Sequence, residues 1–207
     1  MKINDYLNDF TNHLTEAIEI ANNTDLSPCN KKIKNILICG LGGSGIGGTI
    51  LNDIVFEHIN VPISATKDYS IPNFVDENTL VIASSYSGNT EETLYALEAC
   101  QKRRTQIACV TSGGALEKLA KEKGFNCITI PDGQPPRAMF GYSFTQLFFL
   151  LNHYGLIDNS FMSEFEKGIA LLENGHKALA FSSGMAAIYT VFTALLQQGD
   201  HIICTNA

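Results

Sequence analysis

The chain of 207 residues has no tryptophan and comparatively few charged side chains. Charged residues make up 17% of the chain, whereas hydrophobic residues make up 45%. Low charge with high apolar content argues against intrinsic disorder. The 14 basic residues are outnumbered by 21 acidic ones, for a net charge of −7, so a basic nucleic-acid or membrane-binding face is not expected. We expect a folded, acidic protein with neither a nucleic-acid nor a membrane partner.

The six cysteines lack the spacing of a metal site or a disulfide framework. No two of them form a C-x-x-C pair, and Cys39, Cys109 and Cys127 lie in apolar runs of strand length. The five histidines form no short ligand cluster either. Reduced, buried thiols in a cytoplasmic protein without a metal are therefore the expected state.

The chain also lacks a targeting or membrane-spanning pattern. The first five residues do not have the basic and then apolar layout of a signal peptide. The longest apolar stretches, near 146–151 and 186–196, are too short for a bilayer span. Both absences favour a cytoplasmic location.

What the chain does contain is an alternation of apolar runs with helical patterns. An amphipathic helix is expected over 4–21, with Leu7, Phe10, Leu14, Ile18 and Ile20 near one stripe. Strands are expected at 33–39, 61–66, 80–84, 106–111 and 127–130. Helices are expected at 45–59, 90–102, 116–123 and 138–154. This order predicts an α/β fold in which a parallel sheet is covered by helices on both faces.

Ligands of such sheets bind beyond the carboxyl ends of the strands, where loops lead into helices. Three loops in this position carry unusual residues, namely 40–48, 84–90 and 132–137. We expect the function to depend on these three loops.

The first loop is rich in glycine and contains G-x-G-x-x-G at Gly40, Gly42 and Gly45. Glycines let a backbone approach an anion, and the free N–H groups at a helix start attract negative charge. A dinucleotide site is one alternative, with Asp68 as the ribose-binding acid. A tight turn that only packs a helix against a strand is the other.

The second loop and the helix start after it, 84–93, combine several hydroxyl residues with Gly88 and Asn89. Hydroxyls and backbone amides at a helix start suit a compact phosphate monoester, and a dinucleotide site does not require this second nest. Plain helix capping, by Thr90 with Thr93 or by Asn89 with Glu92, would account for only part of the run. The pattern favours a phosphate site.

The third loop places Arg137 directly after two prolines that stiffen the chain. An arginine at this edge of a sheet can clamp a phosphate or stabilise an enolate oxygen. The alternative is an ordinary surface arginine.

Three motifs together resemble the sugar-isomerase (SIS) domain family, most closely its bifunctional phosphoglucose/phosphomannose isomerases. They are GLGGSGIGG at 40–48, SSYSGNTEET at 84–93 and PPRAMFGYS at 135–143, and the resemblance extends over about 3–170. It implies a three-layer αβα sandwich with a five-stranded parallel sheet. The implied organisation is a helix and connection (1–30), the SIS domain (31–158) and a linker helix (159–174). The implied partners are a hexose 6-phosphate and a second copy of the chain, with no cofactor.

The resemblance also assigns roles to individual residues. Gly43 and Ser44 would contact sugar oxygens, and Arg137 would sit beside the reacting carbons in a supporting catalytic role. The phosphate would be held by Ser85, Ser87 and Thr90. Family members interconvert glucose 6-phosphate or mannose 6-phosphate with fructose 6-phosphate through a cis-enediol(ate).

That reaction needs a general base, which in the family is a glutamate of a second SIS domain. The motifs that carry this glutamate, and a histidine and lysine that assist it, are not found in this sequence, so the general base is expected to be absent. Glu91 and Glu92 are interpreted as first-turn helix acids. A non-catalytic phosphosugar-binding module is therefore the alternative function.

The character of the sequence changes in the last segment, 175–207, where Lys177 and Asp200 are the only formal charges. ALAFSSGMAAI at 178–188 and GDHIIC at 199–204 resemble the pyridoxal-phosphate enzymes of cysteine and methionine metabolism, the cystathionine synthase/lyase group. In that family Gly184 and Met185 would offer N–H groups to the cofactor phosphate. Its other cofactor residues would follow Ala207, so we expect a truncated, partial α/β fragment without cofactor. A fragment of such a lyase is the third functional hypothesis.

Overall fold

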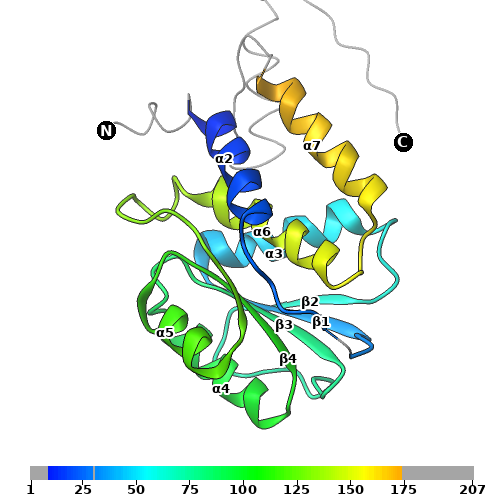
Figure 1. The fold of residues 1–207 in the computed structure, drawn as a ribbon. Coiled ribbons are helices and arrows are strands. Elements are labelled where there is room, and N and C mark those ends of the chain that lie inside the picture. The colour runs from blue at the N-terminus through cyan, green and yellow to red at the C-terminus, as the bar shows by residue number, and fades with distance from the viewer. Residues whose placement is uncertain (1–8, 30, 174–207) are drawn as a thin grey trace, which may run out of the picture. The chain divides into compact units, whose positions relative to one another are not determined.

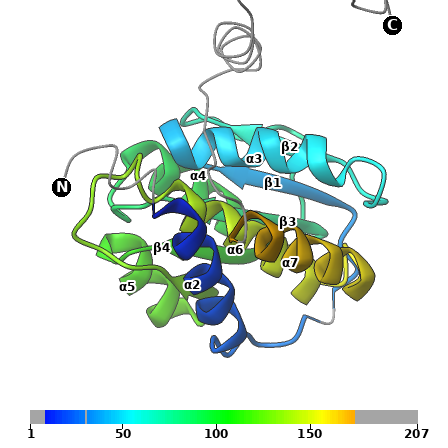
Figure 2. The same cartoon turned by 90° about the horizontal axis from the view of Figure 1, so that it is seen from above.

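The computed structural model describes residues 9–29 and 31–173, which form an α/β fold with three layers (Figure 1). The strands are β1 (Asn35–Cys39), β2 (Ile63–Thr66), β3 (Thr79–Ser84), β4 (Gln106–Thr111) and β5 (Asn126–Thr129). The helices are α2 (Phe10–Asn22), α3 (Gly42–Val55), α4 (Glu91–Lys102), α5 (Gly114–Lys123), α6 (Phe140–His153) and α7 (Asn159–Glu173). Helices α2, α3, α6 and α7 cover one face of the sheet, and α4 and α5 cover the other (Figures 1 and 2).

The described strands form one five-stranded sheet in the order β2-β1-β3-β4-β5, and every neighbouring pair is parallel. Strand β1 pairs Ile38 with Ala65 of β2 on one side and with Ile82 of β3 on the other. The predicted α/β sandwich with a five-stranded parallel sheet is therefore confirmed. The C-terminal fragment expected at 175–207, with Gly184 and Met185, lies outside the described residues.

Two hydrophobic cores form because successive strand residues point to opposite faces of the sheet. Ile36, Ile38 and Ile82 face α3 and α6, in a core that also contains Phe148 of α6. This is the first core. The second core lies on the other face, where Leu37 of β1, Val81 of β3 and Cys109 of β4 face α4 and α5. Side chains buried on both faces explain why these strands are apolar throughout.

The second core is rich in thiols. Cys39, Cys100 and Cys109 are buried in it, while Cys29 and Cys127 are half-buried, and all five are free. Burial raises the pKa of the Cys109 thiol. A hydrogen bond with Cys100, and then burial, raise the pKa of Cys39. Cys39 and Cys109 are thus held in their protonated form, and the burial of Cys39, Cys100 and Cys109 agrees with the expectation of buried thiols.

Helix α2 starts at Phe10, and the part of the expected helix before Asp9 lies outside the described residues. Its buried face consists of His13, Leu14, Ala17 and Ala21, whereas Ile18 is only half-buried. Of the expected stripe, Leu14 is therefore confirmed as buried and Ile20 packs against the core of α3 and α6, but Ile18 lies off the buried face. The small Ala17 side chain allows close packing against α6, where the Gln146 amide donates to the Ala17 carbonyl at 2.8 Å.

Helix α3 begins at Gly42, so most of the stretch 40–48 is helical, although a loop up to Gly45 was expected. Glycine lets this helix lie close to the strand edge. A Cβ on Gly45 would lie 2.5 Å from the Gly40 carbonyl oxygen, and one on Gly48 would lie 3.0 Å from the Ile38 side chain. The tight-turn interpretation thus applies to Gly45 and Gly48.

Helix α7 occupies the range expected for a linker helix, and it packs on α2 and α6. Phe161, Met162 and Ile169 are the side chains that it buries in this contact. No helix within 9–29 and 31–173 is long and apolar enough to cross a membrane. The domain boundaries at 30, 158 and 174 stay a prediction.

Candidate phosphosugar site

The candidate site lies where the chain changes direction across the sheet. Strands β1 and β3 are neighbours, but β1 leads into α3 on one face and β3 leads into α4 on the other. The two loops therefore diverge and leave a crevice between them, which is where open α/β sheets bind their ligands.

A pocket of about 140 Å³ opens at this crevice. Its walls come from the loop after β1, the loop after β3, and the segment that enters α6. It is lined by Leu41, Gly43, Ser44, Tyr86, Ser87, Thr90, Pro136, Arg137, Phe140 and Ser143. Three loops far apart in the sequence thus meet at one place, as the motifs predict.

The first wall is the start of α3. Leu41 is the N-cap residue, and its side chain makes no capping hydrogen bond. The first N–H groups of a helix have no partner within the helix. Gly43 has open space where a Cβ would lie, so an oxygen atom can approach the backbone there. This wall offers backbone donors and a positive helix end to a ligand.

The second wall is the loop before α4. Thr90 is the N-cap residue, but its hydroxyl lies 2.8 Å from the Ser85 hydroxyl and caps no backbone N–H. The Asn89 amide oxygen accepts from the Ala115 N–H at 3.0 Å and so ties the loop to α5. Side-chain capping of α4 is therefore absent, and both capping alternatives are wrong. Ser87 is exposed at the pocket, whereas Ser85 is buried behind Thr90.

Among the described residues that line the pocket, Arg137 carries the only charge. Its side chain is exposed, and within the described part of the chain no hydrogen bond or ion pair engages it. The preceding segment is fixed to the helix start, because the Ala138 N–H donates to the Pro135 carbonyl at 2.9 Å. A cation held in this way gives the pocket a preference for anions.

The acidic residues of the motifs face elsewhere. Glu92 lies beside Gly40 and Asp68 in a separate hollow, and Glu91 lines the surface near Tyr95. Within 9–29 and 31–173, no carboxylate, histidine or lysine lines the pocket. The pocket can therefore bind and polarise an anionic ligand, but its walls hold no strong general base.

The dinucleotide alternative depends on Asp68, which does not line the pocket. The Asp68 carboxylate instead accepts the N–H of Tyr69 at 2.7 Å, in a local turn after β2. The geometry thus favours a compact ligand between the loops over a dinucleotide extended towards β2.

Five lining residues were not among the predicted site residues, namely Leu41, Tyr86, Pro136, Phe140 and Ser143. All five fall inside the motifs at 40–48, 84–93 and 135–143. Phe140 and Ser143 are three residues apart on α6 and so lie on one face of that helix. That spacing, next to Arg137, is the signal by which they could be found.

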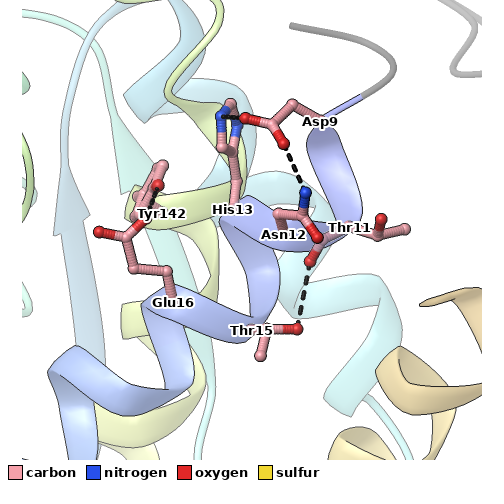
Figure 3. Close-up of polar contacts among 7 residues, drawn as sticks. All are labelled: Asp9, Thr11, Asn12, His13, Thr15, Glu16 and Tyr142. Carbon is pink, nitrogen blue, oxygen red and sulfur yellow. Dashed lines mark hydrogen bonds and ion pairs between the residues drawn. The ribbon is translucent and has the colours of Figure 1, made fainter.

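A polar cluster between α2 and α6 lies next to the pocket wall that Phe140 and Ser143 of α6 form, and Figure 3 shows its side chains. The Tyr142 hydroxyl donates to the Glu16 carboxylate, and the His13 ring packs on the Tyr142 ring with centroids 4.9 Å apart. His13 Nε2 lies 3.4 Å from the Asp9 carboxylate. Because Tyr142 lies between Phe140 and Ser143 in sequence, this cluster holds the end of α6 that borders the pocket.

Comparison with known protein families gives two matches. The model of the SIS domain matches residues 31–153, more than half of the chain, and the described sheet lies within that range. The model of the Cys/Met metabolism PLP-dependent enzymes matches residues 145–207. The second match begins within α6 and otherwise covers α7 and residues outside the described structure.

Individual relatives give a consistent picture. The bifunctional phosphoglucose/phosphomannose isomerase of Caldicellulosiruptor bescii is 44% identical over 145 residues, which is 70% of this chain and 43% of the relative. Its counterpart from Thermoplasma volcanium is 42% identical over 140 residues, 66% of this chain and 44% of the relative. The chain thus spans less than half the length of these relatives.

A solved structure supports the fold. The C-terminal domain of glucosamine-fructose-6-phosphate aminotransferase from Francisella tularensis superposes with a TM-score of 0.63 at 15% identity. The superposition covers 82% of this chain and 53% of that one.

Proposed function

The chain belongs to the SIS domain family, and from this premise we propose that it forms the phosphosugar-binding part of an aldose–ketose isomerase. The proposed substrates are glucose 6-phosphate or mannose 6-phosphate and fructose 6-phosphate. The observation that carries the proposal is the pocket itself. In the part of the chain that the structure describes, two helix starts without side-chain caps and the unpaired Arg137 converge on it, and no acidic side chain lines it.

In the proposed binding mode the phosphate lies at the start of α4. Ser87 and Thr90 donate hydroxyl hydrogen bonds to it, and Ser85 holds the Thr90 hydroxyl in place. The positive end of the helix adds to the attraction. The sugar then extends towards Gly43 and Ser44, where the exposed backbone of α3 meets its oxygens.

The chemistry proposed for this site moves a proton between C1 and C2 of the open-chain sugar through a cis-enediol(ate). Arg137 stabilises the negative charge that develops on the enediolate oxygen. A general base must approach from outside the lining residues, because none of them is a carboxylate, histidine or lysine. We therefore propose that the pocket binds and polarises the sugar, and that turnover requires a group supplied from elsewhere.

We further propose that the chain works in the cytoplasm as a homodimer. Free thiols buried in the second core suit a reducing compartment. Helix α3 carries an outward apolar stripe of Ile46, Ile50 and Ile54, of which Ile46 is 47% exposed and Ile54 is 45% exposed. The stripe supports self-association, because a partner would remove apolar surface from water.

The proposal is tested by titrating the protein with fructose 6-phosphate in a calorimeter. Wild type should bind, and Gly43→Ala should lose at least about tenfold in affinity, because its methyl group would occupy the place of the sugar oxygen. Gly168→Ala is the matched control, since Gly168 is likewise helical with open space around it but lies on α7. A methyl group at either position meets no neighbouring atom, so both variants should stay folded and lost binding cannot be attributed to unfolding.

Two measurements, turnover in a coupled assay and binding of fructose 6-phosphate, decide between the alternatives. A coupled assay for fructose 6-phosphate formation separates an isomerase from a non-catalytic phosphosugar-binding module. Turnover by the chain alone would contradict the inference that the base comes from elsewhere. Absence of fructose 6-phosphate binding, or equal binding by Gly43→Ala, would overturn the proposed site.

A further inference from the structure

Tyr86 connects the three loops that follow β3, β4 and β5. Its carbonyl oxygen accepts from the Ser112 N–H at 2.9 Å and from the Ser112 hydroxyl at 2.7 Å. The residue itself belongs to the loop before α4. Its main chain is therefore bound to the turn after β4 by donors from a neighbouring loop.

The side chain of Tyr86 reaches the third loop. Its hydroxyl accepts the N–H of Gln134 at 3.2 Å, across 48 residues of sequence. The ring is half-buried and packs against the first hydrophobic core. Tyr86 also lines the pocket, so it stands between the proposed phosphate loop and the loop of Arg137.

The contact with Gln134 is placed where it can control Arg137. Residues 135 and 136 are prolines, which have no N–H and a fixed φ, so the Gln134 N–H is the last backbone donor before Arg137. On the other side, Ala138 and Met139 bond back to Pro135 and Pro136 as the chain enters α6. The segment is thus a stiff arm that is fixed at α6 and held at its far end by Tyr86.

We propose that Tyr86 is a positioning residue for Arg137, setting its distance from the phosphate loop so that phosphate and sugar are engaged together. This inference rests on the proposed function of the pocket. It predicts that the Tyr86 hydroxyl affects the sugar end of the ligand more than the phosphate end, because Ser87 and Thr90 are held by their own loop.

The test compares Tyr86→Phe with wild type, since phenylalanine keeps the ring packing and removes only the hydroxyl. Affinity for fructose 6-phosphate should fall by about three- to tenfold, whereas affinity for inorganic phosphate should stay within about twofold. Hydrogen exchange of the Gln134 amide should become faster, because that N–H loses its acceptor. Tyr95→Phe on α4, at a tyrosine that is 58% exposed, is the control and should change neither quantity.

An unchanged affinity for fructose 6-phosphate in Tyr86→Phe would overturn the inference. So would an equal loss for both ligands, because that pattern indicates general disorder of the pocket. If wild type binds no fructose 6-phosphate, the proposed function fails. In that case unchanged Gln134 exchange would show that Tyr86 does not hold the loop either.

Discussion

At the scale of single residues, two loops next to the pocket, those after β3 and β4, pack backbone against backbone. Gly88 has φ +65°, and a Cβ placed on it would lie 1.8 Å from the Gly113 carbonyl oxygen. Gly114, in the neighbouring loop, leaves a similar space towards the Ser87 carbonyl, 2.3 Å from the position of a Cβ. The loop after β3 and the turn after β4 can approach this closely only because Gly88 and Gly114 have no side chains.

Gly88→Ala should therefore destabilise the protein and disturb the pocket. We expect a loss of about 3 kcal/mol or more in the free energy of unfolding, from strain at positive φ together with a backbone clash. Gly124→Ala is the matched control, because Gly124 has φ +70° but nothing within 4 Å of a Cβ. It should cost only about 1–2 kcal/mol. Urea denaturation measures both values, and equal losses would contradict the close approach of the loops.

The motifs in the sequence foretold which residue types would meet at the pocket. Gly43, Ser44, Ser87, Thr90 and Arg137 all line it. The buried place of Ser85 and the link from Tyr86 to the third loop could not be foretold, since both depend on distances between loops that are remote in sequence. Their roles towards a sugar phosphate stay proposals.

At the scale of elements, the end of α6 that borders the pocket is held by α2 through Tyr142 and Glu16 (Figure 3). Burial raises the pKa of the Tyr142 phenol, and its hydrogen bond to Glu16 and the charge of that carboxylate raise it further. Tyr142 thus remains protonated well above the pH at which a free tyrosine, with a pKa of about 10, loses its proton.

This shift predicts how stability depends on pH. Because the pKa is higher in the folded state, the contribution of Tyr142 is complete below pH about 10 and is lost as the pH rises through the folded pKa. Tyr142→Phe should cost about 1 kcal/mol at neutral pH, because the exposed Glu16 can bond to water instead. Above pH about 10 its stability should fall less steeply than that of wild type.

Denaturation at pH 7 and at high pH provides the measurement, with Tyr95→Phe as the control for removal of an exposed hydroxyl. Parallel pH profiles of wild type and Tyr142→Phe would contradict the raised pKa.

The order and type of the described elements could be predicted from the sequence because the apolar runs are long and regularly spaced. Strand β4 begins and ends at the predicted residues, 106 and 111. The start of α3 was placed three residues too late, because glycine disfavours helices and close packing against β1 overrides that preference. The buried face of α2 was predicted only in part: it includes Leu14, but contact with α6 also selects the small Ala17, which was not on the expected stripe.

At the scale of the whole molecule, the comparisons confirm the resemblance to the SIS family that the motifs indicated. The chain spans less than half of its isomerase relatives, and its pocket has binding groups but no strong base among its lining residues. Both facts agree with the proposal that a further part of an assembly completes the site.

The apolar stripe on α3 gives the homodimer proposal a direct test. Ile54→Lys would place a charge in the interface, and the dimer dissociation constant should rise by about tenfold or more, since an unpaired buried charge costs more than about 1.4 kcal/mol. Tyr95→Lys, at an exposed site on the opposite face of the sheet, should leave it unchanged. Light scattering over a dilution series checks both, and a monomeric wild type would refute the dimer.

The burial of the thiols in the second core determines how fast the protein can be oxidised or alkylated. An oxidant or alkylating agent reaches these thiols only when the layer of α4 and α5 separates from the sheet, because Cys39 and Cys109 are buried beneath that layer and Cys100 lies on the buried face of α4. The rate at which these thiols are modified is then set by how often that layer opens, and not by the reactivity of a thiol at the surface. The lifetime of the reduced protein is thereby tied to the local stability of α4 and α5, and α4 follows directly on the loop that contains Ser87 and Thr90.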